Sequence, residues 1–363
     1  MRESTQLVRS GFQALRVSAL ASVATAGSTA PVPANNSAII YEGRYATDAA
    51  GVVRLGFPGV TVHLRFRGAR LTMRVRASQD DIYFDTSIDG AAPTLVRMHS
   101  GEDDYLVVKG GDVAEHAVVL TRRNESWQGT CEILGFDPGS GGELLPPPAM
   151  PKRKLMFIGD SVTCGEKDAY EPGRDLSDKL NSNARVSFGM ILARRLGAQC
   201  HLVSYGGRGV IRDWQGIRDT NNAPQFYELA LPDEAGARWQ HSRYVPDAIG
   251  IQLGTNDFNQ GVPDQNEFVN AYVEFIQKVR RDAPNAAILV MDSPLVNDDS
   301  KGPRRTVLHA YLAQIVARSG SEKVVLAPLK HYPGVPGNGH PTGPEHEAMA
   351  AELEPLLRSR LGW

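Results

Sequence analysis

Three short polar segments carry residues whose types and order could support acyl transfer. Ser161 lies in GDSVTCG, directly after an apolar run, Gly207 lies in SYGGRGVIRDW, and Asn256 lies in LGTNDF. A hydroxyl, a glycine N–H that a ligand can approach closely and a carboxamide donor are the groups that such a site requires. Gly, Asp and Ser are also common turn residues, so Ser161 becomes a candidate nucleophile only if these partners lie beside it.

A fourth segment, GNGHPTGPEHEAMA, supplies the base that this chemistry needs. A histidine that titrates near neutrality can accept the proton of a serine and return it to a leaving alcohol, and we assign this role to His340. We expect His346, on the helix that follows, to be structural. Asp160 and Asp257 adjoin two of the segments and should hold their loops by accepting backbone N–H bonds. A serine nucleophile with a histidine base requires no cofactor and no metal, and no histidine–carboxylate cluster in the sequence has ligand spacing.

The second half of the chain alternates strand-like apolar runs with helical periods, which indicates βαβ units and a parallel sheet. The expected strands are 155–158, 200–204, 248–253, 287–291 and 323–327, and the expected helices are 186–196, 267–281, 306–319 and 344–357. Parallel strands deliver the loops that follow them to one edge of the sheet. We therefore expect a three-layer α/β/α domain over residues 152–363, with a parallel five-stranded sheet. The polar segments should meet at one edge of this sheet.

Residues 38–137 show a period of two instead. Val62, Leu64 and Phe66 alternate with polar residues, which is typical of strands with one face in a core. Many such short strands, separated by Gly, Asp and Asn turns, indicate an all-β, jelly-roll-like sandwich. The outward positions hold Arg65, Arg67, Arg70, Arg74 and Arg76. We interpret these arginines as a solvated face rather than as a site for an acidic polymer. The Gly- and Pro-rich residues 138–151 are the expected linker.

Composition excludes several classes of partner. The 363 residues are 42% hydrophobic with a net charge of −2, which argues against a nucleic-acid partner. No window of about eighteen apolar residues predicts a membrane span. The three cysteines lack metal-ligand spacing, and their odd number leaves at least one unpaired in a monomer. Of these, we expect Cys164 to be a buried small side chain. Residues 1–37 favour a secretory leader, and hence a secreted or periplasmic protein, with a cytoplasmic protein as the alternative.

These segments together resemble the SGNH (GDSL) hydrolases, whose four blocks occur here in order over residues 152–363. The β-sandwich, the stretch TRRNESWQGTCEILGF before a Pro-rich linker, and GDSVTCG are similar to carbohydrate esterase family 2, which extends the resemblance from about Tyr41 to the end. The resemblance implies removal of acetyl groups from polysaccharides such as xylan and glucomannan. It also implies Ser161 as the nucleophile and His340 as the base, with an oxyanion hole formed by the Ser161 N–H, the Gly207 N–H and the Asn256 side chain.

Two positions depart from the family pattern. Many members carry an aspartate two or three residues before the histidine, where this chain has Asn338 and Gly337. We therefore expect a main-chain oxygen of the GNGH loop to orient His340, with a distant acid, Asp292 or Asp298, as the alternative. Members often carry a tryptophan at the position of Gly339. Because glycine cannot stack on a sugar, we expect other aromatic residues such as Trp214 to bind the substrate.

Three functions remain open from the sequence. The favoured one is an acetylesterase acting on an acetylated polysaccharide or oligosaccharide. A second is an SGNH lipase or thioesterase for longer acyl chains, because one fold serves many substrates. A third is a non-catalytic carbohydrate-binding protein with the hydrolase domain kept as a scaffold. Neither the natural glycan nor the oligomeric state follows from the sequence.

Overall fold

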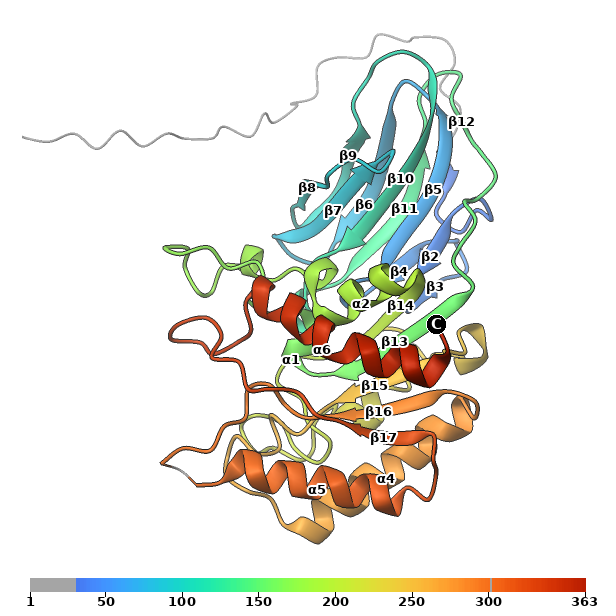
Figure 1. Ribbon diagram of the computed structural model, residues 1–363. Coiled ribbons are helices and arrows are strands. Elements are labelled where there is room, and N and C mark those ends of the chain that lie inside the picture. Colours follow the sequence, from blue (N-terminus) through green and yellow to red (C-terminus); the bar gives the residue numbers. More distant parts are fainter. Residues whose placement is uncertain (1–30, 301) are drawn as a thin grey trace, which may run out of the picture.

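The computed structural model describes residues 31–300 and 302–363. A β-sandwich and an α/β domain lie against each other, and the linker between them runs along the side of the molecule (Figure 1). Most of the predicted leader, residues 1–30, lies outside the described residues. Within them, no helix has both the length and the apolar character to cross a membrane.

Two six-stranded sheets form the sandwich, as the period of two predicts. The first has the order β3-β4-β11-β6-β9 with β1 beside β11, and consists of β1 (Val32–Pro33), β3 (Tyr45–Thr47), β4 (Val53–Leu55), β6 (Leu71–Ala77), β9 (Gly101–Val108) and β11 (Cys131–Asp137). The second has the order β12-β5-β10-β7-β8 with β2 beside β5, and consists of β2 (Ile40–Glu42), β5 (Thr61–Gly68), β7 (Ile82–Ile88), β8 (Thr94–Met98), β10 (Ala114–Arg122) and β12 (Glu143–Leu144). Residues 143–144, which we expected in the linker, therefore extend the second sheet.

Alternation along β5 and β6 sorts side chains between core and solvent. Val62, Leu64 and Phe66 are fully buried, whereas the arginines between them point outward. Outward arginines of both strands pair with acidic residues of neighbouring strands: Arg67 of β5 with Glu115 at 2.6 Å, and Arg76 of β6 with Glu132 at 2.7 Å. The ladder of positive charge is thus neutralised on the sheet itself, in keeping with a solvated face.

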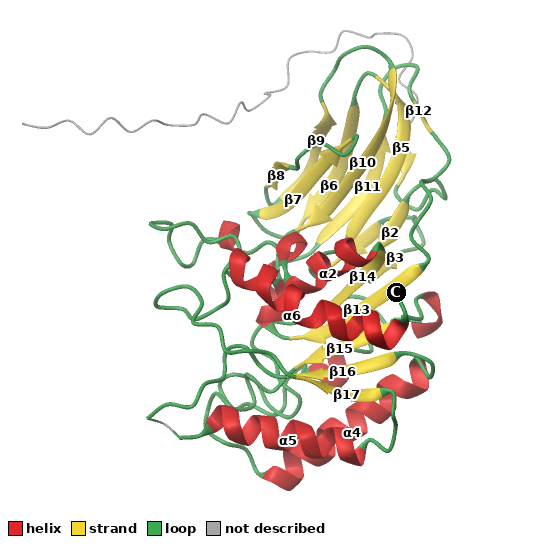
Figure 2. Cartoon of the chain, in the orientation of Figure 1, coloured by secondary structure: helices red, strands yellow, loops and turns green. Residues whose placement is uncertain are grey.

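The α/β domain contains a five-stranded, all-parallel sheet of order β14-β13-β15-β16-β17 (Figure 2). The strands are β13 (Arg153–Gly159), β14 (Ala198–Ser204), β15 (Ala248–Gln252), β16 (Ala287–Met291) and β17 (Val324–Ala327). The longer helices are α2 (Phe188–Leu196), α4 (Gln265–Asp282), α5 (Arg304–Arg318) and α6 (Gly343–Leu361), and the short ones are α1 (Ser161–Cys164) and α3 (Ala223–Phe226). The predicted elements are confirmed, with shifts of a few residues at their ends.

Side chains of β13 face two separate helical layers. Leu155 and Phe157 pack with α2 and α6, whereas Met156 and Ile158 pack with α4 and α5. The α2–α6 pair and the α4–α5 pair accordingly lie on opposite faces of the sheet (Figure 1). A central strand buried on both faces has no reason to alternate, which explains the unbroken apolar run before Ser161.

The segment between β10 and β11 joins the sandwich to the α/β domain. Ser126, in the short 3₁₀ helix η1 (Ser126–Gln128), donates its hydroxyl to the carbonyl of Ser204 at 2.6 Å. The N–H of Ala184 donates to the carbonyl of Arg123 at 3.1 Å. The sandwich core and the core beneath α4 and α5 also form one contiguous apolar cluster. The sandwich is therefore fixed against the loops that follow β13 and β14.

Candidate active site

Ser161 lies at the start of α1, directly beyond the end of β13. The Asp160 side chain accepts the N–H of Val162 at 3.0 Å and so caps this helix. A side chain at Gly159 would lie 2.1 Å from the hydroxyl oxygen of Thr163, so the strand can turn this tightly only with glycine there. The helix ends at Gly165, whose φ of 80° lies in the left-handed region. Ser161 is thus held on a rigid strand-to-helix turn.

The structure brings Ser161 and His340 together across 179 residues of sequence. The hydroxyl Oγ of Ser161 lies 2.7 Å from Nε2 of His340. Two backbone hydrogen bonds close the loop before His340. The N–H of Val335 donates to the carbonyl of His340, and the N–H of Gly339 donates to the carbonyl of Val335. A serine hydroxyl in contact with an imidazole is the arrangement that nucleophilic catalysis requires.

The side chain of Asn338 orients the imidazole from its other side. Its Oδ1 lies 2.5 Å from Nδ1 of His340, so the ring donates Nδ1–H there and presents Nε2 to the serine. This corrects the expectation that a main-chain oxygen of the loop holds the ring. Gly337 and Gly339, with φ of 78° and 82°, turn the chain so that the side chain of Asn338 faces the ring.

The two distant acids that we considered serve other partners. Asp292 contacts Nδ1 of His309 at 3.0 Å, and Asp298 accepts the N–H of Thr306 at 3.0 Å. The amide of Asn338 therefore takes the position that an aspartate holds in a Ser-His-Asp triad, but without its charge.

Burial lowers the pKa of His340, the nearby carboxylate of Glu166 raises it, and the ammonium of Lys167 lowers it again. Oε2 of Glu166 lies 3.4 Å from the same Nε2 that contacts Ser161. The net lowering keeps the imidazole neutral, and so able to accept a proton, into mildly acidic solution.

Gly207 and Asn256 reach the site from the loops after β14 and β15. Gly207 has a φ of 78°, and a side chain there would lie 2.8 Å from Trp214, so the backbone conformation and the contact both favour glycine. Asn256 donates one Nδ2–H to the carbonyl of Arg208 at 2.8 Å. A carboxamide has a second N–H, and Asn256 lines the cavity beside Ser161.

Asp257 stabilises the loop that carries Gly207. Its carboxylate accepts the N–H groups of Val210 at 3.0 Å and Ile211 at 2.8 Å. The two loops that bring Gly207 and Asn256 to the site are thereby tied together, which is the structural role that we expected for Asp257.

A cavity of about 910 Å³ opens over Ser161 and His340. Its lining includes all five predicted site residues, namely Ser161, Gly207, Trp214, Asn256 and His340. Trp214 and Trp127 are each 51% exposed, an unusual fraction for such large apolar side chains. Trp127 belongs to the sandwich, and sequence reasoning missed it. Its signal was a lone tryptophan in the turn-rich stretch NESWQG, outside any strand.

Comparison with known proteins assigns both parts of the chain. The family described as "Carbohydrate esterase 2 N-terminal" matches residues 41–148, and the "GDSL-like Lipase/Acylhydrolase family" matches residues 157–355. A protein of Cellvibrio japonicus named acetylxylan esterase / glucomannan deacetylase is 35% identical over 93% of this chain and 92% of its own length. The chain belongs to the family two carbohydrate esterases. This assignment makes it a carboxylic ester hydrolase, as the sequence predicts.

Solved structures of this family have the same architecture. A family two carbohydrate esterase from Cellvibrio japonicus has a TM-score of 0.87 at 34% identity, covering 92% of this chain and 98% of that chain. A second, from Clostridium thermocellum in complex with cellohexaose, has a TM-score of 0.82 at 30% identity, covering 90% of this chain and 99% of that one. The predicted fold is thereby confirmed over both domains of this esterase.

Two other groups singled out in the sequence take structural positions. His346 is fully buried in α6, where Nδ1 accepts the N–H of Phe188 at 3.1 Å, and burial lowers its pKa to about 3. Cys131, Cys164 and Cys200 are all free and buried, and burial raises the pKa of each thiol. Neither group has the properties of a reactive side chain.

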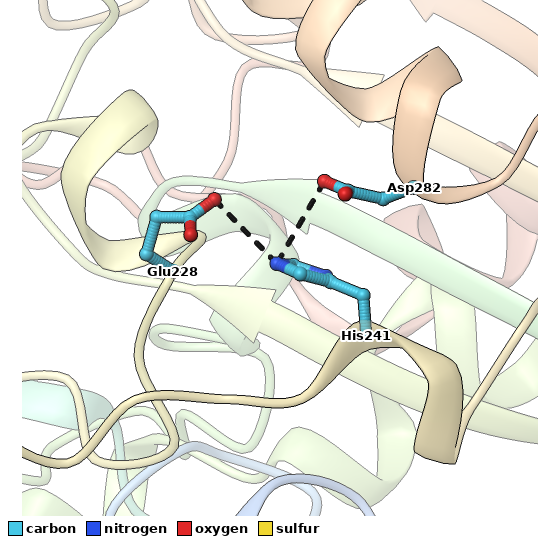
Figure 3. Close-up of side chains that lie close together, drawn as sticks. All are labelled: Glu228, His241 and Asp282. Carbon is cyan, nitrogen blue, oxygen red and sulfur yellow. Dashed lines mark ion pairs between the residues drawn. The ribbon is translucent and has the colours of Figure 1, made fainter.

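A second polar cluster lies outside the cavity lining. Nε2 of His241 is 3.5 Å from Glu228 and 3.7 Å from Asp282 at the end of α4 (Figure 3). This set has the donor types of a metal site, but the ammonium of Lys278 lies 2.5 Å from the same Glu228 oxygen that faces His241. The charge of this Glu228 oxygen is therefore already neutralised by Lys278 rather than by a metal ion. The cluster connects the end of α4 to the turn that carries His241.

Proposed function

We propose that this esterase removes O-acetyl groups from a polysaccharide such as xylan or glucomannan through an acetyl-Ser161 intermediate. The contact of 2.7 Å between Ser161 and His340, on the floor of an open cavity, carries the proposal. The relative from Cellvibrio japonicus is named for deacetylation of the same two polymers.

Acylation begins when Oγ of Ser161 attacks the acetyl carbonyl while Nε2 of His340 takes the hydroxyl proton. The carbonyl oxygen becomes an oxyanion, for which we assign the N–H groups of Ser161 and Gly207 and the side chain of Asn256 as donors. The first-turn N–H of a helix has no carbonyl partner within the helix, so the Ser161 N–H is free of that competition. The intermediate collapses as His340 returns its proton to the departing sugar oxygen, leaving acetyl on Ser161.

Deacylation repeats these steps with water as the nucleophile. His340 takes a proton from the water, the resulting hydroxide adds to the acetyl carbonyl, and the proton then returns to Oγ of Ser161 as acetate leaves. Ser161 and His340 end in their starting states, so the cycle consumes one ester and one water. No other protonatable group has to change state.

The cavity wall suits a sugar chain. Trp127 and Trp214 provide exposed ring faces on which a pyranose can pack. The cavity lining also includes the polar residues Arg208, Asp213, Gln215 and Asn259. Hydroxyl groups of a glycan would find donors and acceptors there, whereas a long acyl chain would leave those groups without partners.

Export follows from a polymeric substrate, because a polysaccharide is degraded outside the cell that uses it. We therefore propose secretion, with the signal in residues 1–37. Determination of the mature N-terminus after expression in the native host tests this.

Acetate release from acetylated xylan and glucomannan tests the function. Ser161→Ala should lower the rate at least about a thousandfold on both polymers, whereas Ser177→Ala, an exposed serine of the same domain, should leave it unchanged. In a chain-length series of p-nitrophenyl esters, acetate should be cleaved faster than butyrate or octanoate. Faster cleavage of octanoate would favour a lipase-like enzyme, and glycan binding with no turnover of any ester would favour a binding protein.

A further inference from the structure

Glu125 of the sandwich places a buried carboxyl group directly beneath the active-site loop. Its side chain is fully buried, and neither carboxyl oxygen makes a well-formed hydrogen bond in the described part of the chain, although the Cys164 thiol and the N–H of Gln128 lie near the group. A side chain on Gly206 would lie 2.1 Å from Oε2 of Glu125, so the loop that carries Gly207 rests against this carboxyl group. A fully buried carboxylate without a well-formed hydrogen bond is costly, which calls for an explanation.

A second carboxyl group, Glu166, faces Glu125. The side chains of these two residues lie within hydrogen-bonding reach, and the Cys164 thiol, Lys167 and Arg122 are the other titratable groups around Glu125. Glu125 is fully buried beside a second carboxyl group, which disfavours its ionised form, and a hydrogen bond between the two groups needs a proton on one of them. Burial and the neighbouring Glu166 both raise the pKa of Glu125 well above its ordinary value.

We propose that Glu125 and Glu166 share one proton, held mainly on Glu125, and so place a single negative charge beside Nε2 of His340. Glu166 is the better site for the charge, because its Oε1 lies 3.6 Å from the ammonium of Lys167 and its Oε2 lies 3.4 Å from the imidazole. Glu125 has no such cation in contact and becomes the donor to Glu166.

This pair acts on the reaction through His340. The imidazole becomes a cation each time it takes a proton from Ser161 or from water, and a carboxylate 3.4 Å away stabilises that cation. The groups that face His340 are Glu166 and Lys167 from the loop after α1, His346 from α6, and the uncharged Asn338. Glu166 is the one whose charge favours the protonated ring. The sandwich thus supplies a positioning residue to the active site, in addition to the wall formed by Trp127.

The inference rests on the proposed catalytic role of His340, so the experiment reads the imidazole directly as well as the activity. Glu166→Gln should lower the pKa of His340, measured by NMR titration of the ring, by about one unit or more. The acid limb of kcat/KM for p-nitrophenyl acetate should move to lower pH by the same amount, and the plateau should fall about tenfold. Lys167→Gln removes the positive charge that lowers the pKa of His340, so it should raise this pKa and move the acid limb of kcat/KM to higher pH.

Glu125→Gln tests whether Glu125 is protonated or ionised. An amide has the shape of a carboxylic acid and can still donate a hydrogen bond to Glu166, so it replaces the protonated form but not the ionised one. We expect the acid limb of kcat/KM to stay at its wild-type pH, and the infrared carbonyl band of a buried carboxylic acid to disappear. Glu171→Gln, an exposed glutamate of the same loop region, is the matched control and should leave the band in place.

A Glu125→Gln protein with a displaced pH profile, or one that keeps the carboxylic acid band, would overturn the assignment of the proton. An unchanged ring titration in Glu166→Gln would overturn the role of the pair, even if Glu125→Gln failed to fold. A wild-type protein that hydrolyses no acetyl ester would contradict the proposed function instead, and the ring titration would still report on the pair.

Discussion

Replacing Asn338 with aspartate adds a negative charge where a neutral amide oxygen now lies 2.5 Å from Nδ1 of His340. An opposite charge at such a distance raises the pKa of an imidazole by about 1–3 units, and the solvent that reaches Asn338 favours the lower part of this range. His340 must be unprotonated to act as the base. The acid limb of kcat/KM for p-nitrophenyl acetate should therefore move to higher pH by about 1–3 units in Asn338→Asp.

Asn338→Ala tests the same contact in the opposite sense. It removes the side-chain acceptor that orients the ring, and because solvent reaches this contact the cost should be that of one net hydrogen bond, about 0.5–1.5 kcal/mol, or roughly 2- to 13-fold in rate. The acid limb should stay near its wild-type position because no charge has changed. Asn270→Asp, an exposed substitution on α4, controls for the added charge and should alter neither quantity. An acid limb that does not move in Asn338→Asp would refute the reasoning, since Nδ1 would then have another partner.

Three further outcomes follow from the structure. Asn256→Ala removes one oxyanion donor and should cost about 3 kcal/mol, on the order of a hundredfold in kcat, with little change in KM for p-nitrophenyl acetate. Trp127→Ala and Trp214→Ala should each raise KM for acetylated polysaccharide about 3- to 10-fold and leave p-nitrophenyl acetate hydrolysis nearly unchanged. The pKa of His346 is about 3 in the folded protein and 6.5 when unperturbed, so its contribution to stability is complete above about pH 6.5 and is lost as the pH falls toward 3. In His346→Gln the amide oxygen can still accept the N–H of Phe188. The free energy of urea unfolding should therefore depend less on pH over that range, by up to about 5 kcal/mol.

The parallel sheet and its loops follow directly from the sequence. The unbroken apolar run before Ser161 reflects burial on both faces, and parallel strands bring the loops that follow them to one edge. Ser161, Gly207 and Asn256 could therefore be placed near one another without coordinates. The boundary between the sandwich and the catalytic domain could also be predicted, because the hydrophobic period changes across the linker.

The orientation of His340 was not predictable in the same way. Whether a backbone or a side-chain oxygen meets Nδ1 depends on the φ angles of Gly337 and Gly339, and glycine permits several values at each position. At a position where many family members have an aspartate, this chain has the uncharged Asn338. Its position two residues before the histidine was a signal that could have found it.

The residues that the sandwich contributes to the active site could not be predicted from the sequence, for a different reason. Glu125 and Trp127 lie before the linker. Trp127 lines the cavity and Glu125 lies against Gly206 only because the segment after β10 packs against the loops after β13 and β14. A contact between two domains produces no hydrophobic periodicity in the sequence of either domain. The signal available was local, since a glutamate and a tryptophan stand together in a stretch that forms no strand.

The most direct test of Ser161 as the nucleophile is to locate the acyl group on the enzyme. Protein quenched in acid during turnover of p-nitrophenyl acetate, then digested and analysed by mass spectrometry, should carry one acetyl group on the peptide that contains Ser161. That group should be absent from Ser161→Ala and should form far more slowly in His340→Ala. Acetyl transfer to a different residue, or full activity in Ser161→Ala, would contradict the account.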